Sequence, residues 1–307
     1  MSPPLQAFIA IFIAGAVLRS FALLTKVHAE RLASVVFSVS LPATILVSLD
    51  HVAFAPSAWK LPLAACLVTL PMLLCSWQIG RVLQLSRQTR GGFLVATGCI
   101  NSVYFAYPVV LATFGDEGLA QAVLFDLGQT TLTLTLIYAL AVWHGAASSS
   151  ARSSLARFFS APPLLALTFI LLLKSVGLHL PTWLHELLFP FHLTTTPLAS
   201  LVLGLSITFD ALRRTWRLTS LGVIVRMGGG CLLGWAAVFL LNLTGLERTV
   251  VILVSAMPSA VTAVIFAAES QLDEDLVASV VALSLCIGVA LLPSLPYLTV
   301  ALMGQSL

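Results

Sequence analysis

A polar interruption that ends in proline lies in the middle of a long apolar run, at Gly98-Cys99-Ile100-Asn101-Ser102-Val103-Tyr104-Phe105-Ala106-Tyr107-Pro108. A second interruption, Ser255-Ala256-Met257-Pro258-Ser259-Ala260-Val261-Thr262, follows 157 residues later, counting from Gly98 to Ser255. Proline lacks an amide hydrogen and clashes with the preceding helical turn, so each interruption predicts a broken helix with free backbone groups. Within a membrane, lipid cannot pair those groups, and they must therefore line a protein cavity.

The composition around these interruptions is that of a membrane protein. Hydrophobic residues make up 59% of the 307 residues, charged residues only 9%, and the mean hydropathy is +1.04. Soluble domains carry about a quarter charged residues, so a water-soluble globule and a disordered chain are excluded. A net charge of +3 over this length makes no phosphate-binding patch, which excludes a nucleic-acid partner. The lipid bilayer is the expected environment.

The apolar runs predict an all-α membrane protein. Continuous runs such as 164–173 exclude the alternating pattern of a β-barrel. A span takes roughly 20 apolar residues, so the length allows on the order of ten transmembrane helices. The expected spans are 5–24, 32–54, 58–81, 91–114, 118–143, 161–179, 193–211, 217–243, 248–268 and 275–303.

The basic residues predict the orientation. Counted by alternate sides of these spans, 11 of the 15 Lys and Arg residues fall on one side and three on the other, while Arg226 lies within a span. The positive-inside rule makes the first side cytoplasmic. Both termini are then expected outside, and the polar, serine-rich segment 144–160 is expected to be a cytoplasmic linker.

The linker divides the chain into two halves, 1–143 and 161–307, of about five helices each. The halves align weakly: Pro3-Pro4-Leu5 matches Pro162-Pro163-Leu164, and Asp116-Glu117 matches Asp273-Glu274 at a similar shift. An odd number of spans per half places the second copy upside down relative to the first. Such inverted five-helix repeats are typical of secondary transporters.

The two interruptions correspond in these repeats and predict a ligand site. If helices 4 and 9 break at the midplane and cross, two half-helix N-termini with partial positive charge face a small space that suits an anion. Asn101, Ser102, Ser259 and Thr262 would act as helix caps and hydrogen-bond donors to a carboxylate, and Tyr104 or Tyr107 would flank the organic body. The alternative is that Pro108 and Pro258 are kinks packed by neighbouring helices.

These residues resemble the auxin efflux carrier family in its short bacterial form. The resemblance covers nearly the whole chain and is carried by Asn101 through Pro108, by Phe114-Gly115-Asp116-Glu117-Gly118-Leu119-Ala120, by Val123-Leu124-Phe125-Asp126-Leu127-Gly128 and by Met257-Pro258-Ser259-Ala260-Val261. It also includes Pro197-Leu198 and Leu203-Gly204-Leu205-Ser206. Membership would place the protein in a plasma membrane, the inner membrane of a bacterium.

The resemblance implies the fold of the bile acid sodium symporters. Helices 1, 2, 6 and 7 would form a scaffold, and helices 3–5 and 8–10 a transport domain with elevator-type alternating access. The crossed helices 4 and 9 would bind the substrate, with Met257, Pro258 and Pro108 beside the polar residues. Members export or exchange small organic anions, including auxin in plants and dicarboxylates in bacteria. The plant carriers have paired prolines and a long central loop, which this chain lacks, so auxin is a poor candidate substrate.

Two charged residues inside spans are functional candidates, because charge within a membrane is costly. Asp126 lies about seven residues into the fifth span and is either a proton-coupling residue or a partner in a polar network near the crossover. Arg226, in the eighth span, is either a counter-ion for the substrate or a side chain that reaches the cytoplasmic surface. The neighbouring spacing Gly230 to Gly234 indicates close helix packing. Asp50, at a span end, is expected to be solvated.

Enzymatic functions find no support in the sequence. His185 lacks the second histidine four residues later that a zinc protease helix needs, and no glycine-rich phosphate loop with a lysine is present. No cofactor or metal ion is expected. The remaining alternatives are a sodium-coupled symporter of the same fold and a membrane receptor that binds its ligand without moving it. Neither interruption contains the acidic oxygens that favour sodium. A homodimer is compatible with these features.

Overall fold

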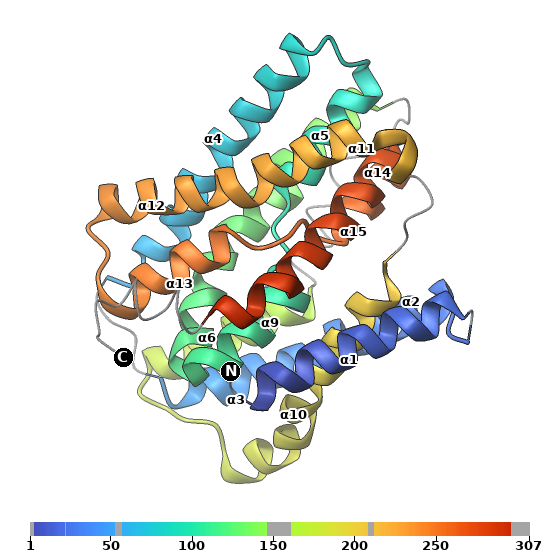
Figure 1. Ribbon diagram of the computed structural model, residues 1–307. Helices are drawn as coiled ribbons and strands as arrows, with labels where there is room; N and C mark the ends of the chain where they lie inside the picture. The colour runs from blue at the N-terminus through green and yellow to red at the C-terminus, as the bar shows by residue number, and fades with distance from the viewer. Residues whose placement is uncertain (1–2, 22, 53–56, 146–160, 208–211, 296–307) are drawn as a thin grey trace. The chain divides into compact units, whose positions relative to one another are not determined.

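A computed structural model describes residues 3–21, 23–52, 57–145, 161–207 and 212–295 (Figure 1). Across this part of the chain all regular secondary structure is helical, and the β-structure consists of one isolated bridge. The predicted all-α class is therefore confirmed.

Seven of the helices in the described ranges are long and apolar enough to cross a membrane. Their bounds are Pro3–Ser20, Val27–Asp50, Lys60–Val82, Ser102–His144, Thr182–Leu205, Arg214–Leu241 and Glu274–Ser294, and a shorter apolar helix covers Pro162–Ser175. Gly115, with a φ of 65°, is non-helical and divides the longest of them. The count of ten spans and their inverted repeat stay predictions.

The chain divides into two compact units. The first combines Met1–Ala58, Val103–Val123 and Ala156–Ile207, so it draws on three separate parts of the sequence. Besides the start of α6 (Tyr107–Leu132), its helices are α1 (Pro3–Ser20), α2 (Lys26–Val35), α3 (Leu41–Asp50), α9 (Pro162–Ser175) and α10 (Thr182–Leu205), with the π-helical turn η1 (Val36–Ser40) between α2 and α3 and η2 (Ser102–Ala106) before α6.

Two glycines set the packing of α1 against α10 in the first unit. A Cβ atom on Gly204 would lie 2.2 Å from the carbonyl oxygen of Phe12, and one on Gly15 would lie 2.8 Å from that of Leu201. Side chains at these positions would force the backbones apart, so the close contact depends on small residues. Hydroxyl groups join α3 to α10, with the Thr44 and Thr195 oxygens 2.6 Å apart.

The second unit combines Trp59–Ser102, Leu124–Leu155 and Thr208–Leu307. It contains α4 (Lys60–Val82), α5 (Arg87–Gly98), the end of α6, η3 (Thr133–Ile137), α7 (Tyr138–His144), α11 (Leu212–Val223), η4 (Ile224–Gly229), α12 (Gly230–Leu241), α13 (Gly245–Ser255), α14 (Thr262–Ser270), α15 (Glu274–Leu291) and η5 (Leu292–Ser294). Side-chain caps start two of these helices: the Ser86 oxygen accepts from the Thr89 amide before α5, and the Asp273 carboxylate accepts from the Leu276 amide before α15. Both interruptions recognised in the sequence lie within this unit or begin in it.

Candidate functional site

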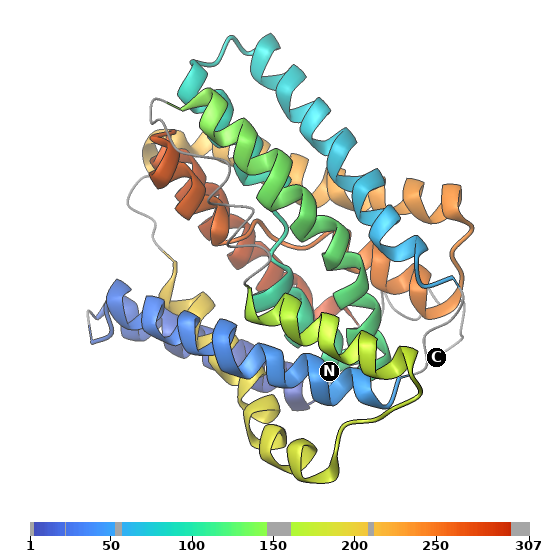
Figure 2. The ribbon, with the colours of Figure 1, turned by 180° about the vertical axis from the view of Figure 1, so that it is seen from behind.

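The two interrupted helices are joined to each other by backbone hydrogen bonds within the second unit. After α5 and after α13 the chain leaves the helix in an extended connection (Figures 1 and 2). The Asn101 amide donates to the Pro258 carbonyl at 2.9 Å, and the Ala260 amide donates to the Cys99 carbonyl at 3.1 Å. These two bonds form an antiparallel bridge between Ile100 and Ser259. The connections therefore satisfy each other where lipid could not.

Every carbonyl group of the last turn of α5 has a hydrogen-bond donor. A helix leaves four such carbonyl groups without a partner of its own, and burying them unpaired would cost free energy. Three of the four donors here are side chains from other parts of the unit. The pairs are Cys99 N to Val95 O at 3.1 Å, Ser259 Oγ to Ala96 O at 2.6 Å, Arg226 Nη1 to Thr97 O at 2.9 Å and Gln129 Nε2 to Gly98 O at 2.9 Å.

The last turn of α13 is satisfied in the same manner. Backbone amides that follow the helix serve three of its carbonyl groups, and a side chain serves the fourth. The pairs are Ala256 N to Ile252 O at 3.2 Å and to Leu253 O at 3.1 Å, Met257 N to Val254 O at 3.2 Å, and Arg226 Nη2 to Ser255 O at 2.5 Å. Arg226 is thus the side chain that contacts both helix ends.

Arg226 lies in η4 and its side chain is fully buried. Two glycines of α12 make room for it and for α13. A Cβ atom on Gly230 would lie 2.0 Å from the Ser255 carbonyl oxygen and 2.4 Å from Arg226 Nη2, and one on Gly234 would lie 2.8 Å from Ser255 Cβ. The packing role predicted for these glycines is confirmed. The expectation that Arg226 could extend to the cytoplasmic surface is wrong, because the helix ends hold both of its terminal nitrogens.

Asn101 and Ser259 lie at the centre of the paired connections and are nearly inaccessible, at 2% and 0% exposed. The Asn101 side-chain amide donates to the Ser259 carbonyl oxygen at 3.4 Å, and the Ser259 amide donates to Ser284 Oγ at 3.1 Å. Ser102 is also buried, and its hydroxyl has no partner among the described residues. Met257 and Pro258 are buried beside them.

The polar side chains do not cap the second half-helices as the sequence suggested. Val261, which has no side chain able to accept, is the N-cap of α14, and Thr262 is the first residue of the helix itself. Ser259 instead donates to the last turn of α5. A carbonyl group at the end of α5 binds the Ser259 hydroxyl, since a hydroxyl group can donate as readily as it accepts. Their contact with a substrate stays a prediction.

The remaining predicted residues of the first interruption belong to the first unit. The Tyr104 hydroxyl donates to the Ala33 carbonyl at 3.2 Å, and Tyr107 and Pro108 are buried. The structure thus groups Asn101, Ser102, Arg226 and the second interruption in one unit, and it groups Tyr104, Tyr107 and Pro108 in the other.

Asp126 lies in the part of α6 that belongs to the second unit. It is 8% exposed, and the hydroxyl of Thr130, one turn later, donates to its Oδ2 at 3.1 Å. A buried, hydrogen-bonded carboxylate within a long apolar helix is consistent with both roles expected from the sequence, proton coupling and a polar network.

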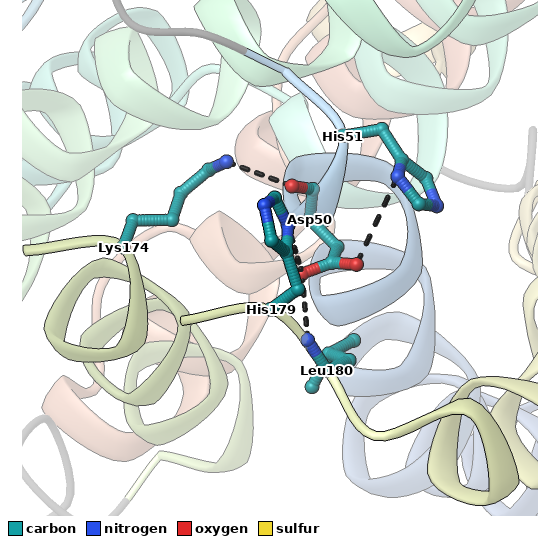
Figure 3. Close-up of polar contacts among 5 residues, drawn as sticks. All are labelled: Asp50, His51, Lys174, His179 and Leu180. Atoms are coloured by element: carbon teal, nitrogen blue, oxygen red, sulfur yellow. Dashed lines mark hydrogen bonds and ion pairs between the residues drawn. The ribbon is translucent and has the colours of Figure 1, made fainter. Parts of the chain in front are cut away.

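Asp50 is buried in the first unit, which the sequence did not indicate (Figure 3). The loop between α9 and α10 covers the end of α3, and its Leu180 amide donates to Asp50 Oδ1 at 2.9 Å. From the last turn of α9, Lys174 Nζ donates to the Asp50 carbonyl at 2.8 Å. His179 Nδ1 lies 3.5 Å from Oδ1, and His51 Nδ1 lies 3.9 Å from Oδ2. The expectation of a solvated Asp50 is therefore wrong.

Comparisons of the sequence with known proteins identify the family of the chain. A family model described as membrane transport protein matches residues 1–297. An uncharacterized transporter of Methanocaldococcus jannaschii is 27% identical over 267 residues, which cover 84% of this chain and 86% of the relative. An uncharacterized transporter of Methanothermobacter thermautotrophicus is 29% identical over 289 residues, 91% of this chain and 92% of the relative. The match over almost the whole chain confirms the resemblance stated from the sequence: the protein belongs to the auxin efflux carrier family of membrane transport proteins.

Proposed function

We propose that the protein is a secondary active transporter or facilitator of small organic anions. The substrate carboxylate would bind at the two interruptions, which follow α5 and α13 and correspond to the fourth and ninth spans expected from the sequence. The observation that carries the proposal is the bridge between Ile100 and Ser259, which joins the two breaks inside one compact unit. Breaks of this kind in membrane helices are tolerated where they line a cavity, and in transporters they form the ligand site.

The charges around the breaks favour an anion. The C-terminal ends of α5 and α13 carry partial negative charge, and the Arg226 guanidinium binds a carbonyl group of each. The N-terminal end of α14 carries partial positive charge and has no side-chain cap. The amides of Ala263 and Val264 in its first turn already donate to the Ala260 and Val261 carbonyl groups, so it is the partial positive charge of the helix end that suits a carboxylate. Asn101 and Ser102 supply further donors, while Thr262 lies at the helix start.

The two compact units support an elevator mechanism, in which a transport domain moves against a scaffold. The first unit contains the helices that the family resemblance assigns to the scaffold, namely α1 to α3, α9 and α10. The second contains Asp126, the whole second break and residues 98–102 of the first break, whereas residues 103–108 of the first break lie in the first unit. We propose that the second unit carries the substrate across the membrane.

Transport by purified protein in liposomes tests this function. Labelled mono- and dicarboxylates would be screened with and without proton and sodium gradients, followed by binding titrations on Asn101→Ala and Ser259→Ala. Loss of a hydrogen bond to a charged group costs about 1.5–3 kcal/mol, so Asn101→Ala is expected to weaken binding roughly ten-fold or more. Ser259→Ala is expected to weaken it less, because the single hydroxyl donor of Ser259 is bonded to the Ala96 carbonyl of α5 and affects the site through that helix end. Ser220, in α11, provides a control that should leave binding unchanged.

Wild-type affinity in both variants would place the ligand elsewhere and return the breaks to structural kinks. Uptake that requires sodium would instead identify a sodium-coupled symporter. Binding without uptake under any gradient would identify a receptor.

We further propose that Asp126 couples transport to protons. Asp126→Asn keeps a group that can accept from Thr130 but removes the titratable carboxylate. Gradient-driven uptake should fall while substrate binding is retained. An unchanged dependence of uptake on the proton gradient would remove Asp126 from the mechanism.

The orientation proposed for the transporter places residues 144–160 in the cytoplasm and both termini outside. A cysteine introduced at Ser149, which lies outside the described residues, should resist a membrane-impermeant thiol reagent in intact cells. Its modification there would reverse the orientation.

A further inference from the structure

A fully buried guanidinium needs a source of compensation. Taking a cation out of water costs several kcal/mol unless nearby negative charge and hydrogen bonds replace the lost hydration. No carboxylate within salt-bridge distance of Arg226 is found in the parts of the chain that the structure describes. Its hydrogen-bond acceptors are instead two backbone carbonyl groups, those of Thr97 and Ser255.

The two acceptors are not ordinary carbonyl groups, because each lies in the last turn of an interrupted helix. A helix C-terminus carries a partial charge of about −0.5, so two such ends together offer about one negative charge. That amount matches the single positive charge of Arg226. The interaction therefore has two effects. The partial charges of the helix ends compensate the charge of the guanidinium, and the guanidinium donates to carbonyl groups that lipid would leave without a partner.

The shape of the side chain suits this arrangement. A guanidinium presents rigid, diverging N–H groups, whereas a lysine ammonium is a point charge on a flexible stem. Nη1 binds the end of α5 and Nη2 binds the end of α13, so the fork fixes the separation of the two ends. Gly230 keeps the space beside Nη2 and the Ser255 carbonyl open.

We infer that Arg226 is a positioning residue that fastens the C-terminal ends of α5 and α13 to each other and thereby holds the paired connections in register. Arg226 does not bind the substrate directly; it acts on the site through the two helix ends. Its consequence for transport rests on the proposed function, whereas its effect on the helix ends does not.

Gln129 provides a matched comparison, because it contacts only one of the two ends. Its Nε2 donates to the Gly98 carbonyl of α5, and it also lies within the buried part of the second unit. Replacing it by methionine removes the bond to α5, together with the bonds that Gln129 makes with Thr69 of α4 and Thr133 of η3, without removing a charge. Replacing Arg226 by methionine removes one bond to each helix and the charge, while it keeps an unbranched apolar stem in the place of the arginine stem.

Hydrogen exchange of the backbone amides, measured on protein in lipid nanodiscs, separates these effects without any ligand. The informative peptides are 95–101 and 252–260, with α10 of the first unit as an internal reference. In Arg226→Met both peptides should exchange at least ten-fold faster while α10 is unchanged. In Gln129→Met only the first peptide should become faster. Unchanged exchange in Arg226→Met, or faster exchange in one peptide alone, would overturn the inference.

Arg226→Lys keeps the charge and decides the matter if Arg226→Met does not yield folded protein. Faster exchange than wild type in both peptides, but slower than in a fully unpaired segment, is expected because an ammonium cannot bind both ends with the same geometry. Wild-type exchange in both peptides would show that the fork is not needed and would overturn the inference.

Transport of the labelled carboxylates by the same variants distinguishes this inference from the proposed function. A positioning residue predicts that Arg226→Lys lowers the maximal rate of uptake more than it raises the apparent KM. A direct ligand predicts a raised KM with normal exchange in both peptides, which would contradict the inference. Absence of carboxylate transport by the wild type, together with the expected exchange pattern, would refute the proposed function and leave the role of Arg226 intact.

Discussion

Each unit of the molecule uses a cation to close the C-terminal end of a helix, but the two units do so differently. In the first unit Lys174 binds the carbonyl of Asp50, the last residue of α3, and the side chain is only partly buried. In the second unit Arg226 is fully buried and binds the ends of two helices. A lysine side chain can bind the one partly buried helix end of the first unit. The two buried helix ends of the second unit need the diverging N–H groups of a guanidinium.

The difference extends to the neighbouring charge. Asp50 places a carboxylate at a helix C-terminus, where the helix dipole disfavours it, and the hydrogen bond from the Leu180 amide offsets this, while two exposed histidines lie nearby. Around Arg226 the helix ends themselves supply the opposite charge. Disturbing the second arrangement should therefore cost more than disturbing the first, because water cannot replace the lost partners.

The largest expected effect comes from Gly230→Ala. Its Cβ would lie 2.0 Å from the Ser255 carbonyl oxygen and would displace either α13 or the Arg226 fork. Overpacking costs about 1–3 kcal/mol, and loss of a hydrogen bond to a charged group about 1.5–3 kcal/mol, against a gain in helix propensity of about 1 kcal/mol. We expect a net loss of about 1.5–5 kcal/mol, visible as a lower melting temperature of the purified protein.

Gly228→Ala is the matched control for this substitution. It lies two residues away in η4, and a Cβ atom there meets nothing within 4 Å. Its melting temperature should equal or exceed that of the wild type. Equal melting temperatures for the two variants would show that the contact between Arg226 and Ser255 contributes little.

A smaller effect is expected from Asp50→Ala in the first unit. The substitution leaves the buried Leu180 amide without an acceptor, which costs about 1–3 kcal/mol, while Lys174 keeps its bond to the backbone carbonyl. Asp50→Asn retains an acceptor oxygen and should cost less. Thermal unfolding of both variants checks this order. A loss for Asp50→Ala greater than that for Gly230→Ala would reverse the comparison between the units.

The sequence indicated the interrupted helices because their signal is local. Proline and small polar residues within an apolar run, at Asn101 and Pro258, mark a break wherever the chain folds, and the structure has both breaks. The all-helical class follows in the same way from uninterrupted apolar runs. The family was recognisable from the same segments, since they combine the breaks with neighbouring residues at fixed spacing.

The partners of the helix ends could not be predicted from the sequence. Arg226 lies 129 residues from Thr97 and 29 from Ser255, and no local pattern connects them. A charged residue in a span signals a function of some kind, but a substrate and a helix end are equivalent partners until the packing is known. The prediction that Asp50 is solvated was wrong for a related reason. Its position at a span end indicated exposure to solvent, whereas the loop carrying Leu180 covers it.

The smallest expected effect comes from His179→Ala, which tests whether the exposed histidines matter for the Asp50 arrangement. The His179 side chain is 69% exposed and its Nδ1 lies 3.5 Å from Asp50 Oδ1. Exposed ion pairs contribute about 0–1 kcal/mol and weaken further with salt, so the melting temperature should change little and the change should shrink at high ionic strength. A loss as large as that of Asp50→Ala, unaffected by salt, would mean that the histidine and not the Leu180 amide holds the carboxylate. The arrangement around Asp50 would then depend on a solvent-exposed side chain, whereas the one around Arg226 depends on a fully buried side chain. The two units would then differ more than their hydrogen bonds alone indicate.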